Sequence, residues 1–123
     1  MTRVELLQPL LAVTGEADAS IFDGWEVIPG YIRGEHAATV ILNGTEVHLA
    51  VTPAFRNRAL LFRREVNKLI APLLERLGFL TTRIALTATA QKQFVERVGF
   101  KPTWSDTIFQ YYMLSELPFA RSK

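Results

Sequence analysis

Cysteine is absent from this sequence of 123 residues, so the chain can form no disulfide and has no thiolate nucleophile. Cysteine-ligated metal sites are excluded for the same reason, and the absence of cysteine fits a reducing compartment. The two histidines, His36 and His48, are too few for most zinc sites. We therefore expect no metal site.

Long apolar runs are also missing. No run approaches the ~20 residues that a membrane-spanning helix needs, so we expect no membrane partner. The first eighteen residues have too short an apolar core and too many acidic residues for a signal peptide. We expect a cytoplasmic protein.

Strong net charge is a third feature that the sequence lacks. The formal charge is +2, although the pI is 9.2. Basic residues cluster in one place only. We interpret this cluster as a solvated helix face that Glu65 interrupts. Because the net charge is also low, a nucleic-acid partner is not expected. The cluster consists of Arg56, Arg58, Arg63, Arg64 and Lys68.

The composition is that of a folded globular protein, with 49% apolar and 21% charged residues. A chain of this length buries about two thirds of its unfolded surface. We expect one domain over residues 1–123, with an N-terminal segment at 1–24 that matches no recognised pattern well and a loosely held tail at 115–123.

The N-terminal elements are the least clear part of the pattern. Residues 4–13 place four leucines near one side of a helix, but Pro9 removes an interior hydrogen bond. The alternative is a short strand followed by a short helix from about Gln8. Residues 14–24 indicate a loop, and residues 25–32 a strand that Pro29-Gly30 interrupts.

The clearest pattern is a β-hairpin. Residues 37–42 and 45–51 alternate as strands, and Asn43-Gly44 between them suits a type I′ turn. In the second strand Glu46, His48 and Ala50 share one face, and Val47, Leu49 and Val51 share the other.

A long helix follows the hairpin. Pro53 ends the strand, the chain turns over residues 54–58, and Gly78 terminates the helix. Pro72 predicts a kink, or a last turn that restarts there. The predicted core stripe contains Ala59, Phe62, Val66, Leu69, Ile70, Leu73, Leu74 and Leu77.

The C-terminal part predicts strand, helix and hairpin. Residues 81–86 form the strand, and Thr87 or Thr89 caps a helix that ends at Gly99. Its buried side is predicted to hold Ala90, Phe94, Val95 and Val98. A hairpin over residues 101–114 turns at Ser105-Asp106, and its apolar alternation predicts that both faces are largely covered.

This order of elements predicts an α/β fold in the broad sense, an α+β mixed sheet: a central antiparallel or mixed sheet with flanking helices and a C-terminal hairpin. Three sequence segments resemble the GNAT N-acyltransferase superfamily. They are residues 46–58 (EVHLAVTPAFRNR), residues 94–101 (FVERVGFK) and the terminal hairpin. The resemblance covers about residues 37–114 and leaves 1–24 unmatched.

The resemblance implies an acyl-CoA site where the central strand meets the long helix. Unpaired N–H groups at a helix start suit a pyrophosphate, and the family's loop pattern falls on Arg56, Ala59 and Leu61, where Ala59 and Leu61 replace small or flexible residues. The cofactor, acetyl-CoA if the protein is active, would contact Val51, Arg56, Asn57, Arg58, Ala59 and Leu61.

The resemblance also suggests catalytic groups. Either Glu46 or His48 is a candidate general base that activates an amine through water. In the late helix, the family's Asn and its thiolate-protonating Tyr fall on Ala88 and Val95, which cannot transfer a proton. Tyr111 or Tyr112 is a candidate replacement from the last strand.

The second half of the chain is also similar in architecture to small internal virion proteins of short-tailed bacteriophages. Together with the altered loop, this similarity favours a degenerate GNAT-fold protein without catalysis or cofactor, acting in phage particle assembly or as a binding module. It would occupy the host cytoplasm or virion and bind a protein partner or form a homodimer. The alternative is an acyl-CoA-dependent N-acyltransferase that transfers an acetyl group to an amine.

Overall fold

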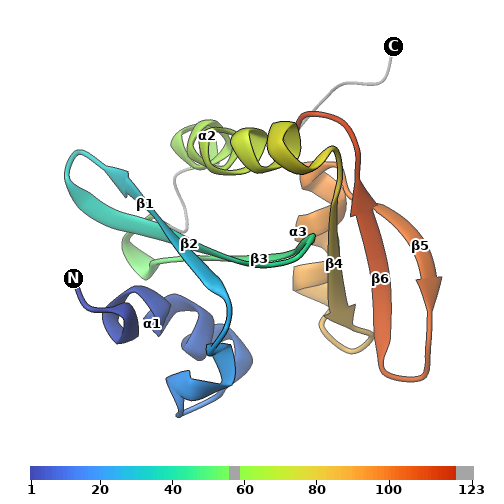
Figure 1. The fold of residues 1–123 in the computed structure, drawn as a ribbon, viewed down its shortest axis with the longest axis horizontal. Coiled ribbons are helices and arrows are strands. Elements are labelled where there is room, and N and C mark those ends of the chain that lie inside the picture. Colours follow the sequence, from blue (N-terminus) through green and yellow to red (C-terminus); the bar gives the residue numbers. More distant parts are fainter. Residues whose placement is uncertain (56–58, 119–123) are drawn as a thin grey trace. The chain divides into compact units, whose positions relative to one another are not determined.

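A computed structural model describes residues 1–55 and 59–118 of the protein. The chain divides into two compact units, Met1–Glu65 and Val66–Lys123. Figure 1 traces the elements along the chain. The expected single domain over residues 1–123 stays a prediction.

The first unit is built on three antiparallel strands in the order β1-β2-β3. They are β1 (Glu26–Ile32), β2 (Glu35–Asn43) and β3 (Glu46–Val51). The predicted early strand and the predicted hairpin are therefore confirmed. β1 is irregular near Pro29-Gly30, as expected, because the register shifts between Gly30 and Tyr31.

The turn between β2 and β3 differs from the prediction. Asn43 is paired with Glu46, so the two-residue loop is Gly44-Thr45 rather than Asn43-Gly44. Within residues 43–45, φ is positive only at Gly44, where it is +63°. A type I′ turn needs positive φ at both loop residues, whereas glycine at the first position is typical of type II′.

Helix α1 (Arg3–Thr14) covers one face of this sheet (Figure 1). It runs through Pro9 without a break, so the alternative of a strand before Gln8 is wrong. Thr2 and Glu5 form a reciprocal capping box at its start. Gly15, with φ of +75°, ends it by donating its N–H to the Leu11 carbonyl at 2.9 Å.

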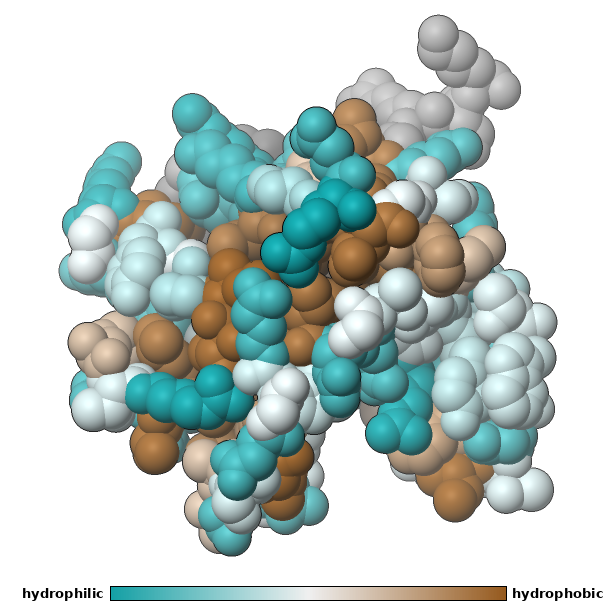
Figure 2. Space-filling model, in the orientation of Figure 1, coloured by the Kyte–Doolittle hydropathy of each residue, from teal (hydrophilic) through white to brown (hydrophobic). Residues whose placement is uncertain are grey.

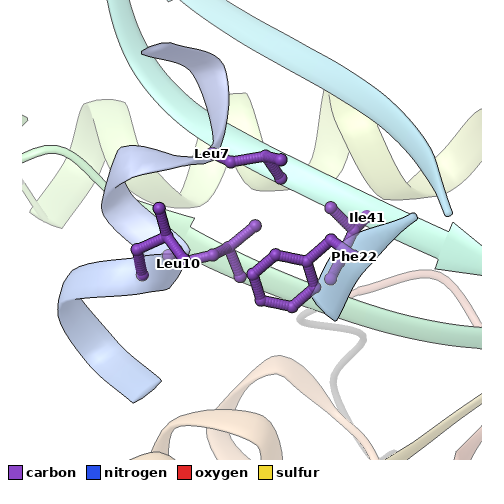
Figure 3. Close-up of a cluster of buried hydrophobic side chains, with 6 residues drawn as sticks. Leu7, Leu10, Phe22 and Ile41 are labelled. Carbon is purple, nitrogen blue, oxygen red and sulfur yellow. The ribbon is translucent and has the colours of Figure 1, made fainter. Parts of the chain in front are cut away.

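The core under α1 joins side chains from three elements. Leu7 and Leu10 of α1, Phe22 and Ile41 point toward one another (Figure 3). Phe22 belongs to η1 (Ala19–Phe22), a 3₁₀ turn inside the segment that the sequence predicts to be a plain loop. The turn forms there because Asp18 is its N-cap residue and accepts the N–H of Ser20, the second residue of the turn.

The second long element is α2 (Ala59–Leu77), which follows the short 3₁₀ turn η2 (Pro53–Phe55). α2 continues through Pro72, so the predicted restart does not occur. Pro72 is exposed, and Gly78 ends the helix with φ of +85°. Four predicted stripe residues are buried, namely Val66, Ile70, Leu73 and Leu74, and Leu69 and Leu77 are half-buried. The side chains of Ala59 and Phe62 lie outside the described residues.

The second unit contains three antiparallel strands in the order β4-β6-β5 and one helix. They are β4 (Leu80–Ala85), α3 (Thr89–Val98), β5 (Lys101–Ser105) and β6 (Phe109–Leu114). Ala88, not a threonine, precedes α3, and its side chain makes no capping bond. Val95 and Val98 are buried and Phe94 is half-buried, but Ala90 is exposed, against prediction.

The terminal hairpin is confirmed, but one of its faces is not covered. All five residues of β5 are exposed, and Trp104 retains 59% of its accessible surface. On this face Trp104 stacks on Tyr111 at 4.4 Å between ring centroids, and the Arg83 guanidinium lies 4.9 Å from the centroid of the Phe109 ring. Figure 2 shows hydrophobic surface at the end of this hairpin. Ile108, in the turn between β5 and β6, is 61% exposed.

Across the ranges 1–55 and 59–118, no helix combines the length and apolar character that a bilayer crossing requires. The predicted tail is described as far as Pro118, and the remainder lies outside the described residues.

Candidate active site

Strand β3 brings the two predicted base candidates together. Their alternation puts both side chains on the face of the sheet that α1 covers, the face that also carries Ala50. His48 Nε2 lies 2.6 Å from Glu46 Oε2. The side chains are 26% and 27% exposed, so the pair is partly desolvated while solvent still reaches it.

The short contact restricts the histidine tautomer. An ionised carboxylate only accepts hydrogen bonds, so Nε2 of His48 must carry the proton that points to Glu46. In the neutral ring the lone pair then resides on Nδ1, which can accept a proton. Glu46 would stabilise the imidazolium that results, so the pair has the chemistry of a histidine base oriented by a carboxylate.

Two residues connected to His48 were not predicted as site residues: Trp25, whose ring lies beside it, and Arg3, which bonds to the backbone of Trp25. The indole of Trp25 lies 5.6 Å from the His48 ring, centroid to centroid, with the ring planes at 55°. Arg3 donates through Nη2 to the carbonyl oxygens of Phe22 at 2.8 Å and Trp25 at 2.9 Å. Pairing of the first strand with the hairpin could have indicated Trp25, but no local pattern marks a bond that spans 22 residues.

The predicted cofactor residues are only partly described. Val51 ends β3, is half-buried and packs against the cluster of Ile32, Ala37 and Phe55. It lies three residues from His48, about 10 Å along a strand, on the opposite face. Arg56, Asn57 and Arg58 lie outside the described residues, as do the side chains of Ala59 and Leu61.

The start of α2 has a charge distribution that suits an anion. Ala59 is its first residue, and its first turn contains no acidic residue. The helix is nineteen residues long, and a helix start carries a partial positive charge and unpaired N–H groups. Two arginines precede it in the sequence, Arg56 and Arg58.

The other histidine has a structural setting. Thr39 is fully buried, and its hydroxyl donates to the Leu6 carbonyl oxygen at 2.5 Å. The hydroxyl has one proton, so the 2.7 Å contact with His36 Nε2 requires the histidine to donate. His36 therefore helps to tie β2 to α1.

Neither tyrosine proposed for thiolate protonation is well suited to it. Burial, with a hydrogen bond from Tyr112 Oη to Glu96 Oε2 at 3.0 Å, raises the pKa of Tyr112 to about 12. The hydrogen bond to Asp106 raises the pKa of Tyr111. An alkyl thiol has a pKa of about 8.5, so proton transfer from Tyr112 to a thiolate is uphill. Val95, at the family's tyrosine position, is buried and apolar.

No group of three or more His, Asp or Glu side chains in residues 1–55 and 59–118 has a geometry that could hold an ion. Every buried side-chain nitrogen or oxygen in the same ranges has a hydrogen-bond partner.

The fold is that of the GNAT acetyltransferases. A Bacillus subtilis acetyltransferase in complex with CoA is similar with a TM-score of 0.70 at 13% identity, covering 95% of both chains. A GNAT family acetyltransferase from Elizabethkingia anophelis with acetyl-CoA bound has a TM-score of 0.63 at 12% identity, covering 94% of this chain and 92% of the other. The Escherichia coli ribosomal-protein-S18-alanine N-acetyltransferase has a TM-score of 0.59 at 17% identity, covering 100% and 93%.

No protein-family model and no curated protein sequence matches this chain. The likeness in structure confirms the predicted fold class, an α+β GNAT-like architecture. It gives no support to the resemblance to phage virion proteins or to a role in phage particles.

Proposed function

We propose that this protein is an acyl-CoA-dependent N-acyltransferase that transfers an acetyl group to an amine. The observation that carries the proposal is the 2.6 Å pair of His48 and Glu46 on β3. The fold supports it, because structures with this fold include acetyltransferases with CoA or acetyl-CoA bound. This proposal replaces the non-catalytic role favoured by the sequence.

Acetyl-CoA, when bound, would supply a thioester as the acetyl donor, with CoA thiolate as the leaving group. The residues that would hold it are Val51, through its backbone, and the start of α2 with Arg56 and Arg58. They fit an anionic group by charge, since the first turn of α2 carries no acidic residue.

His48 takes the proton of the attacking amine at Nδ1, through a water molecule. Glu46 holds Nε2–H and stabilises the resulting imidazolium. Val95 and Ala88 provide no acid for the departing sulfur. A thiol with a pKa of about 8.5 is a good leaving group as the thiolate, and solvent can protonate it.

Calorimetric titration with acetyl-CoA tests the cofactor assignment. We expect micromolar binding to the wild-type protein and none to Arg56→Glu, because the reversed charge repels the pyrophosphate. Arg97→Glu is the matched control, since Arg97 is an exposed arginine on α3. Absence of binding to the wild-type chain would favour the non-catalytic binding module.

Release of free thiol in the presence of a panel of amines tests the base. We expect His48→Gln to lower kcat by about 10² or more, as is typical for loss of a general base. Glu46→Gln should lower it less, since the imidazole remains. Glu35→Gln is the control, because Glu35 is an exposed carboxylate on β2. Equal rates in all four proteins would remove His48 and Glu46 from the mechanism.

A further inference from the structure

We infer that Arg3 and Trp25 are positioning residues that fix the orientation of the His48 imidazole. This inference rests on the proposed function, in which His48 is the base. Both residues lie before residue 37, where the family resemblance in the sequence begins. The segment that looked unrelated to the site would thus support it.

Arg3 forms hydrogen bonds to the backbone of the segment just before β1. A single guanidinium nitrogen donates to two carbonyl oxygens, those of Phe22 and Trp25. The Trp25 N–H also bonds to the Phe22 carbonyl at 3.1 Å, so this short turn is closed twice. Arg3 is itself held as the first residue of α1, where Thr2 and Glu5 cap the helix.

Trp25, whose backbone Arg3 holds, contacts the His48 ring. Its side chain is half-buried and packs against the core cluster of α1, η1 and the sheet. The indole lies 5.6 Å from the imidazole at 55°, within the range of favourable aromatic pairs. Glu46 holds the Nε2 edge of the same ring. The ring is therefore contacted at one edge by a carboxylate and elsewhere by a fixed indole.

The position of a base matters because a displacement of about 1 Å can cost up to about a hundredfold in rate. Loss of the indole removes a ring contact that holds the imidazole in the orientation it has beside Glu46. We therefore expect Trp25→Leu to reduce the fraction of His48 that carries its proton on Nε2. Trp25→Phe should retain most of it, since a ring still fills the space.

Nitrogen-15 spectra of the two histidines provide a readout that needs no activity. At about pH 8.5, above the ordinary histidine pKa of about 6.5, the ring nitrogen shifts report the tautomer. His48→Gln assigns the signals. The variants are Arg3→Met, Trp25→Leu and Trp25→Phe, with Arg97→Gln and Trp104→Leu as matched controls in the second unit.

The inference predicts mixed tautomers of His48 in Arg3→Met and Trp25→Leu, and wild-type spectra in the controls and largely in Trp25→Phe. Where thiol release is measurable, kcat should fall about tenfold in the first two variants with KM for acetyl-CoA unchanged. Circular dichroism checks folding. Where a variant unfolds, Arg3→Gln replaces Arg3→Met and Trp25→Met replaces Trp25→Leu, with the same expected change in the His48 spectrum.

A wild-type His48 spectrum in folded Arg3→Met and Trp25→Leu overturns the inference, whatever their activity. A changed tautomer in a protein that acetylates no amine supports the positioning role and overturns the proposed function. The two ideas therefore fail in distinguishable ways.

Discussion

At the scale of single residues, Thr39 makes two polar contacts from a fully buried position in the first unit. Its hydroxyl is buried between a backbone carbonyl of α1 and the ring of His36. Removing one partner of a buried hydrogen bond costs about 1–3 kcal/mol. This contact therefore contributes to how firmly α1 is held on β2.

Replacing Thr39 by Val should lower the free energy of unfolding by about 2 kcal/mol, since the shape is kept but two partly buried partners, the Leu6 carbonyl and His36, lose their bonds. Thr39→Ser keeps the hydroxyl and loses one methyl group, which should cost about 1 kcal/mol. Urea denaturation measures both. A valine variant as stable as the serine variant would contradict the assigned hydrogen bonds.

The residues of the candidate site differ in how well they can be predicted from the sequence. The two-residue period of a strand suffices to place Glu46 and His48 on one face. Their 2.6 Å contact follows from that spacing and two suitable rotamers. Arg3 leaves no such trace, because its partners are backbone carbonyls 19 and 22 residues away. Any residue type at those two positions would offer the same acceptors.

At the scale of elements, the turn of the first hairpin shows a limit of pattern reasoning. A loop at Asn43-Gly44 would pair Leu42 with Thr45, but Leu42 pairs with Val47. The observed register is therefore shifted by two residues from the predicted one. Such a shift leaves every side chain on the same face, so the apolar alternation cannot distinguish the two registers. The choice of turn residues decides between them, and Asn-Gly was the stronger signal.

Alanine substitutions separate the two turns. Gly44→Ala should lower the free energy of unfolding by about 1–2 kcal/mol, because alanine is strained at a φ of +63°. Asn43→Ala should cost less than about 0.5 kcal/mol, as for other exposed sites without special geometry. Thermal denaturation of both variants provides the comparison. A larger loss for Asn43→Ala would favour the type I′ turn instead.

The second hairpin depends on a charged turn residue. Asp106 accepts the N–H groups of Phe109 at 2.6 Å and Ile108 at 2.8 Å. These bonds lower the pKa of Asp106 below its ordinary value of 3.8, and the bond from Phe109 has the largest effect. The pKa of Asp18 is lowered by Ser20 in the same way, and that of Glu5 by Thr2.

A lowered pKa means that the folded turn favours the carboxylate. Its contribution to stability is present above pH 3.8 and is lost as the pH falls through the lower folded value. The amide shifts of Ile108 and Phe109 should therefore titrate with a midpoint below 3.8 in the wild-type protein. Asp106→Asn should abolish this titration. A midpoint at or above 3.8 would contradict the assigned bonds.

At the scale of the whole molecule, the apolar patterns predicted the order of elements, since core stripes and strand alternation are properties of sequence alone. The GNAT-like class came from the resemblance of three sequence segments to that superfamily. The apolar patterns did not predict the open face of the second hairpin. Phe109, Tyr111 and Met113 alternate as a buried set would, yet Met113 is exposed and the other two are half-exposed. An apolar face shows that burial is favourable, not that a partner layer exists.

Helix α2 belongs to both units, with residues 59–65 in the first and residues 66–77 in the second. The proposed acetyl-CoA contacts lie at its first turn. A ligand that binds only the folded state adds about 2.7 kcal/mol of stability at a hundred times its Kd. Helix formation is cooperative, so the added stability should extend along the helix.

Saturating acetyl-CoA should therefore slow hydrogen exchange of the α2 amides in residues 66–77, by up to about a hundredfold. Mass spectrometry of peptides from this range measures the effect. Arg58→Glu, which removes a proposed contact, should show little slowing at the same ligand concentration. Slowing confined to residues before Val66 would mean that the two ends of α2 unfold independently, and that binding at the first turn is not transmitted to the second unit.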